Sequence, residues 1–277
     1  MPGIIFAGLV VLMLFFPGAS ALPTDELKVS VYAPDCTTVL NTTTLSIRWM
    51  EGNLPVQGDG ITHYYHQGPV FVEPKEGQWD RNETANFKDM GAVKGTAVRD
   101  LVSLVGGMEP GDEVMIKAID GYHVEFGYQN IYRPDPRQGN ITVIWFNGEE
   151  SAVGERQGTG YPPSYHVGMR LIFLADNSTN TGGKHVFGNG DMREVMPAEK
   201  IHLFEDLYPS TSGYTVKWVD EVRVYRGGYQ GSHDALPKSY EAKMEEVYPP
   251  PPTEGPILWV SVLAACCSLI VFRRGMR

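Results

Sequence analysis

Most apolar positions between residues 22 and 228 follow the spacing of β-strands. Alternating apolar and polar residues, or short apolar runs, predict strands at 27–32, 45–50, 69–72, 141–146, 169–175 and 215–225. The last of these strands contains Trp218, which we expect to be buried against a neighbouring helix or its sheet.

One segment changes to helical spacing. The apolar residues of 96–105 recur every three or four positions, and Gly106 and Gly107 supply a stop signal. Thr96 is the expected N-cap. The pattern predicts one helix of about three turns.

Two dipeptides indicate tight connections. Strands at 113–119 and 122–126 meet across Asp120-Gly121, a pair that tolerates the positive φ angles of a type I′ turn. Asn147-Gly148 indicates a second hairpin. Residues 176–191 are rich in Asn, Thr and Gly, which predicts a loop. The whole pattern predicts an α+β domain dominated by β-structure.

Residues 1–21 predict a signal peptide. Residues 4–16 are apolar apart from Gly8, and Ala19, Ser20 and Ala21 form a cleavage site of small residues. An uncleaved N-terminal anchor is the alternative. Either interpretation places the domain at 22–228 outside the cytoplasm.

Residues 256–277 predict attachment to the cell membrane. Residues 257–272 are almost wholly apolar, near the lower limit of about 17 residues for a spanning helix. Arg273, Arg274 and Arg277 follow, and such cations stay in the cytoplasm. We therefore expect a single-pass protein, with a sorting tail that is cut off as the alternative. Four consecutive prolines within 229–255 favour a stiff stalk.

Charge and cysteine content narrow the classes of function. The net charge is −10, and an acidic surface repels phosphate backbones, so no nucleic-acid partner is expected. Cys36 is the only cysteine before the apolar tail, which excludes an internal disulfide in the domain. Triplets at Asn41, Asn82, Asn140 and Asn177 fit the N-glycosylation pattern expected of an exported glycoprotein.

Five short motifs follow one another between residues 92 and 226. They are VRDLVSLVGG (98–107), DGY (120–122), FNGE (146–149), GMRL (168–171) and GYTVKWV (213–219). In this order and spacing they resemble the molybdopterin-binding domain of the sulfite-oxidase family. The resemblance implies a mostly-β mixed fold that holds molybdenum through a pterin dithiolene and one protein cysteine.

The same resemblance implies where a cofactor would bind. It leaves His166, Arg170 and Lys217 as cofactor-binding candidates, in which the two cations would hold a pterin phosphate by charge-assisted hydrogen bonds. The alternative is that Arg170 and Lys217 form structural ion pairs with the many acidic residues. His166 stands one position out of register with the family's histidine, and Tyr214 replaces a cation that the family often carries.

The chain departs from the family at the metal itself. The family's cysteine lies upstream of the helix that 98–105 matches, but no cysteine lies between Cys36 and the tail. Thiolate is the soft ligand that such a site needs. Its absence argues against ordinary sulfite-oxidase chemistry.

Two further polar clusters are candidate sites. His63 and His66 lie near the expected place of that cysteine, and imidazole suits several transition metals. Neighbouring Gly and Pro disfavour a helix, and on a strand the two rings would point to opposite faces, so an exposed pair is favoured. The Gly-rich segment 184–191 could cradle an anion, but an ordered surface loop is favoured because no helix is evident after it.

Two functions compete. In the first, an exported redox protein retains molybdopterin or another metal cofactor in altered form and meets a redox partner. In the second, the scaffold is a non-catalytic binding or structural module at the cell surface. Hydrolase and nucleotidase functions have no support, because the chain carries no Gly-x-Ser-x-Gly, His-Glu-x-x-His or Walker pattern.

The first prediction concerns the two ends. Residues 22–255, produced without them, should stay in solution, because no other long apolar run occurs in the sequence. Ultracentrifugation in detergent-free buffer measures this. Recovery in the membrane or detergent fraction alone would contradict the assignment of 256–277 as the sole anchor.

Overall fold

The computed structural model describes residues 25–231, so the predicted signal peptide, the tail and nearly all of the stalk lie outside the described residues. The strands are β1 (Glu26–Tyr32), β2 (Val39–Ser46), β3 (Val56–Gln57), β4 (His63–Gln67), β5 (Phe87–Ala97), β6 (Glu113–Ala118), β7 (His123–Gly127), β8 (Asn140–Asn147), β9 (Arg170–Leu174), β10 (His185–Phe187), β11 (Leu203–Phe204), β12 (Tyr208–Pro209) and β13 (Val219–Tyr225). The helices are α1 (Ile47–Asn53), α2 (Val98–Ser103), α3 (Tyr128–Tyr132) and α4 (Asn189–Val195), with 3₁₀ turns at Lys75–Trp79, Ala198–Lys200 and Thr211–Tyr214.

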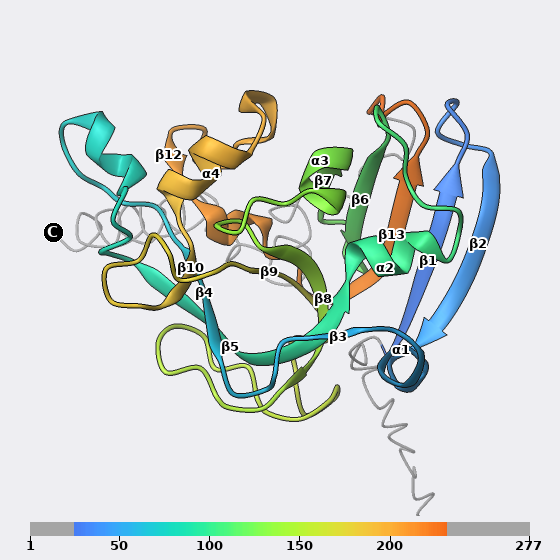
Figure 1. Cartoon of the computed structure of the whole chain (residues 1–277), viewed down its shortest axis with the longest axis horizontal. Helices are drawn as coiled ribbons and strands as arrows, with labels where there is room; N and C mark the ends of the chain where they lie inside the picture. The colour runs from blue at the N-terminus through green and yellow to red at the C-terminus, as the bar shows by residue number, and fades with distance from the viewer. Residues whose placement is uncertain (1–24, 232–277) are drawn as a thin grey trace, which may run out of the picture. The chain divides into compact units, whose positions relative to one another are not determined.

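These elements form a mostly-β α+β domain with two mixed sheets (Figure 1). One sheet has five strands in the order β2-β1-β13-β6-β7. The other has the order β10-β4-β5-β8-β9, with β3 paired to β5, and it curls into a half-barrel. Each sheet contains one parallel pair, β1 with β13 and β10 with β4. None of the helices among residues 25–231 is long and apolar enough to cross a bilayer.

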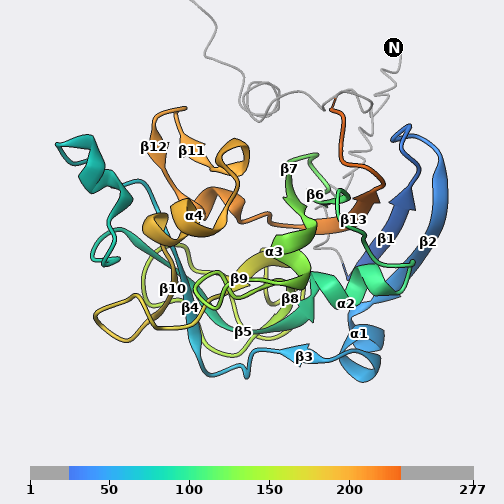
Figure 2. The ribbon, with the colours of Figure 1, turned by 45° about the horizontal axis from the view of Figure 1, so that its top comes forward.

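The main core lies between the two sheets. The helix α2 sits at their junction in both views (Figures 1 and 2), where it contacts β1, β8 and β13. Its residues Val98, Leu101 and Val102 are fully buried. The indole of Trp145 on β8 is also fully buried and donates a hydrogen bond from Nε1 to Thr96 Oγ1 at 3.0 Å. The apolar stripe of α2 therefore packs against strands of both sheets.

A helix within the predicted range 96–105 is confirmed, but its predicted length of about three turns is wrong, because α2 begins at Val98 and ends at Ser103. Thr96 is not its N-cap, because this residue still belongs to β5 and its hydroxyl accepts the Trp145 N–H. Gly106 and Gly107 both have positive φ angles, which confirms the predicted stop.

The strand predicted at 45–50 is wrong beyond Ser46. The Ser46 hydroxyl accepts a hydrogen bond from Trp49 N at 3.3 Å and caps α1. Ile47 and Met50, three positions apart, are the buried residues of this helix. The strand predicted at 69–72 is also wrong, because this segment is irregular.

The first predicted hairpin is confirmed by β6 and β7, although its turn is not type I′. Only Gly121 has a positive φ angle, and the Asp120 carboxylate accepts a hydrogen bond from Tyr122 N at 2.9 Å. The turn is therefore stabilised by this side-chain hydrogen bond, and it does not need a second residue in the left-handed conformation.

The second predicted hairpin is wrong. Asn147 continues into an antiparallel bridge with Gly160, and the chain reaches β9 only after a long loop. A Cβ atom on Gly148 would lie 2.0 Å from Gly60 O. The glycine is therefore required for a close backbone approach and not for a turn.

Residues 176–191 are not a loop throughout. They include β10, which pairs with β4, and the beginning of α4. Asn189 and Asp191 are buried, so the surface-loop interpretation of 184–191 is wrong from β10 onward. The tertiary pairing with β4 overrides the loop-like composition.

The strand predicted at 215–225 begins only at Val219, and Trp218 is not buried. Trp218 has a φ angle of 51° and is 36% exposed. Its Nε1 donates to His166 O at 3.3 Å. The left-handed backbone at this position breaks the strand alternation that would have turned the indole inward.

The two tryptophans give a matched stability prediction. Trp145→Ala should lower the free energy of unfolding by about 3–5 kcal/mol, because it leaves a large cavity and an unpartnered Thr96 hydroxyl. Trp218→Ala should cost about 1 kcal/mol or less. Denaturant titration of both variants measures the difference, and equal losses would contradict the placement of the core.

Candidate functional site

The three residues predicted from the resemblance do lie in one region. Backbone hydrogen bonds of 2.8–3.0 Å join the segment 167–171 to the segment 216–219. This pairing brings His166, Arg170 and Lys217 near one another. Their side chains, however, have different surroundings.

Arg170 is a buried cation. It is the first residue of β9 and is only 5% exposed, on the face of the strand that also carries Ile172. Its Nε and Nη1 atoms have no hydrogen-bond partner among the described residues. Burial lowers the pKa of the Arg170 guanidinium, while nearby Tyr165 and Glu155 act in the opposite direction.

Lys217 and His166 are already engaged. The half-buried Lys217 forms an ion pair with the half-exposed carboxylate of Glu155, in the loop between β8 and β9. The exposed His166 ring places Nε2 2.8 Å from Arg156 O in the same loop. Glu155 is thus the acid that faces both Lys217 and, through its charge, Arg170.

His66 is a buried neighbour of Arg170 that the sequence did not assign to this region. Its Nε2 accepts a hydrogen bond from Phe173 N at 3.2 Å, so the ring proton lies on Nδ1, 3.1 Å from Thr215 Oγ1. Burial, with a further contribution from the charge of Arg170, lowers the pKa of His66 to about 3.

The prediction that His63 and His66 form an exposed pair is therefore wrong, because His66 is buried and His63 is not fully exposed. His63 is half-buried, and its Nδ1 lies 2.9 Å from the Asp89 carboxylate. As expected on a strand, the two rings make separate contacts and share no ligand set. No group of three or more His, Cys, Asp or Glu side chains within 25–231 could hold a metal ion.

Cys36 lies at the opposite end of β13. It is buried, and its Sγ is 3.9 Å from the carbonyl oxygens of Pro34 and Gly228. The seven residues of β13 span roughly 20 Å between this end and the segment that carries Lys217. The thiol is therefore far from Arg170.

The four predicted glycosylation sites differ in accessibility. Asn41, Asn82 and Asn177 are exposed. Asn140 is half-buried, and its Nδ2 donates to Gln57 Oε1 at 2.9 Å.

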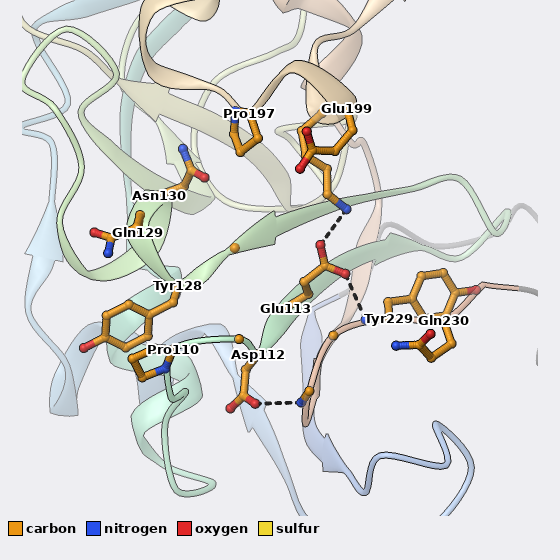
Figure 3. Close-up of a pocket in the computed structure, with 15 residues that line it drawn as sticks. Pro110, Asp112, Glu113, Tyr128, Gln129, Asn130, Pro197, Glu199, Tyr229 and Gln230 are labelled. Atoms are coloured by element: carbon orange, nitrogen blue, oxygen red, sulfur yellow. Dashed lines mark hydrogen bonds and ion pairs between the residues drawn. The ribbon is translucent and has the colours of Figure 1, made fainter.

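A surface hollow at the Cys36 end was not predicted from the sequence. Segments 110–113, 127–130, 197–200 and 227–230 line a volume of about 490 Å³, here called the Glu113 groove (Figure 3). Tyr128 and Tyr229 lie on opposite sides of it, with Glu113 between them. Four segments that are far apart in the sequence build the groove, so no single motif predicts it. The Gly and Tyr residues of these segments are the one signal in the sequence that points to it.

The Glu113 carboxylate is held in place by two donors. Its Oε1 lies 2.8 Å from Lys200 Nζ, and its Oε2 accepts a hydrogen bond from Tyr229 N at 2.8 Å. Asp112 accepts a hydrogen bond from Gly227 N at 2.9 Å and pairs with Arg226. These contacts fix the walls of the groove.

No protein-family model matches the chain, and a search of curated proteins finds no match.

The His66 pKa gives a pH prediction. In the unfolded chain the imidazole takes up a proton below about pH 6.5, whereas the folded protein resists this down to about pH 3. The unfolded state therefore binds more protons in this window, and stability should fall as the pH falls. Denaturant titrations between pH 7 and 4 should show a smaller fall for His66→Gln than for the wild type. Equal slopes would contradict a neutral buried His66.

Proposed function

We propose that the protein is an exported, membrane-attached binding module on a divergent sulfite-oxidase-like scaffold, without molybdenum chemistry of its own. The order of five family-like motifs and the mostly-β fold support the scaffold. The apolar ends of the sequence support export and attachment. The observation that carries the proposal is the place of Cys36, at the far end of β13 from Arg170.

The residues implied for molybdopterin do not fit that group. A molybdenum centre of this kind needs a protein thiolate, and the described residues around Arg170 include no cysteine. Lys217 is neutralised by Glu155, and the His166 ring contacts backbone on the surface. The ion pair with Glu155 supports the alternative interpretation, in which Lys217 has a structural role.

A second function is favoured by one specific observation. Within residues 25–231, the buried Nε and Nη1 atoms of Arg170 have no hydrogen-bond partner, which is costly in a protein interior. An anionic group of a bound ligand would satisfy them. The second candidate function is therefore that of a redox protein, which retains a cofactor in altered form beside Arg170.

Elemental analysis separates the two functions. The full chain, produced in a host that synthesises molybdopterin, should carry well under one molybdenum per chain, because no thiolate reaches Arg170. Near-stoichiometric metal that is lost in Arg170→Ala, but retained in the control Arg133→Ala at an exposed cation, would overturn the proposal. Metal lost in Cys36→Ser would overturn it as well.

A further inference from the structure

We infer that the Glu113 groove binds a neutral carbohydrate. The inference names a site and a ligand class for the proposed binding module, and rests on that function. The volume of the Glu113 groove, about 490 Å³, lies within the range of about 300–1,000 Å³ that is usual for small-molecule sites.

The charges of the groove are largely cancelled within the protein. Glu113 pairs with Lys200, and Asp112 pairs with Arg226. Among the acidic residues that line the groove, Glu199 alone makes no ion pair within the described part of the chain. An anionic ligand therefore meets no uncompensated cation, and it would be repelled by Glu199. The charges of the groove therefore disfavour an anionic ligand.

The hydrogen-bonding groups suit hydroxyl groups. A hydroxyl both donates and accepts, so it is best matched by a donor next to an acceptor. The ammonium of Lys200 and the carboxylate of Glu113 are such a pair, fixed 2.8 Å apart, and each keeps unused capacity. Bonds to these charged groups are stronger than bonds between neutral groups. The exposed amides of Gln129 and Gln230 add further donors and acceptors at the rim (Figure 3).

The apolar surfaces suit the C–H faces of a sugar ring. Tyr128 lies at one side of the groove near Pro110, and Pro197 lies on another side (Figure 3). The Tyr128 ring stacks on Tyr132 with centroids 4.7 Å apart, which holds it in position. A rigid ring beside fixed polar groups is a preorganised surface for a ligand that is polar at its edge and apolar on its face.

The ligand class is tested with the full chain in detergent. Titration calorimetry and saturation-transfer NMR would use the neutral sugars maltotriose, cellotriose, mannotriose and N,N′,N″-triacetylchitotriose. Trigalacturonate serves as an anionic comparison and the chitosan trimer as a cationic one. We expect at least one neutral trisaccharide to bind with a Kd of about 5 mM or tighter, and trigalacturonate to bind about tenfold more weakly because Glu199 repels its carboxylates. Binding of none of the four, or tighter binding of a charged oligosaccharide, overturns the inference.

The place of binding is tested with substitutions. Tyr128→Ala should weaken binding about tenfold or more, whereas Tyr128→Phe keeps the ring and should bind within about twofold of the wild type. Gln129→Ala, at an exposed rim position, should weaken binding about threefold and tests the site even where Tyr128→Ala fails to fold. Tyr122→Ala, at an exposed tyrosine outside the groove, should change nothing.

Unchanged binding in both Tyr128→Ala and Gln129→Ala places the sugar elsewhere and overturns the inference. The metal analysis reports on the proposed function separately. A chain that binds molybdenum but no sugar refutes both proposals, whereas a metal-free chain that binds no sugar refutes the groove alone.

Discussion

The parallel pairing of β1 with β13 is the constraint on which the rest of the domain depends. It joins Lys28 to Glu221, 193 residues later, and their side chains form an ion pair at 3.1 Å. Such a long-range contact forms only after a large loss of chain entropy, so the intervening strands must support it. Once formed, β13 fixes both candidate sites: its beginning holds the Arg170 region, and its end leads into the Glu113 groove.

Local patterns predicted the elements whose signals lie within one segment. The apolar runs of β1, β6, β8 and β9 and the apolar stripe of α2 are of this kind. The predictions failed where a distant partner decides the structure. Trp218 turns outward because its backbone hydrogen-bonds to the loop before β9, and Gly148 serves a contact with Gly60. In the same way, the resemblance made Arg170 and Lys217 candidates, but it gave no indication of Glu155, which comes from an irregular loop.

The Arg170 region shows how an acidic chain accommodates a buried cation. Glu155 supplies a negative charge from the surface, and Tyr165 lies beside the guanidinium in the interior. The cation in turn helps to keep His66 neutral. Such buried polar groups contribute little net stability, because desolvation offsets their attraction. Their arrangement instead restricts how the loop between β8 and β9 can pack.

The outermost strand β2 has a consequence for how copies of the molecule meet. It ends the five-stranded sheet, so one side of its backbone has no strand partner within residues 25–231. Val39 and Leu40 on this strand are 46% and 57% exposed, and three threonines follow. An open, β-branched edge of this kind is a template for strand addition between chains. Asn41 lies on the same strand and is exposed, so a glycan attached there would act as a steric guard against aggregation.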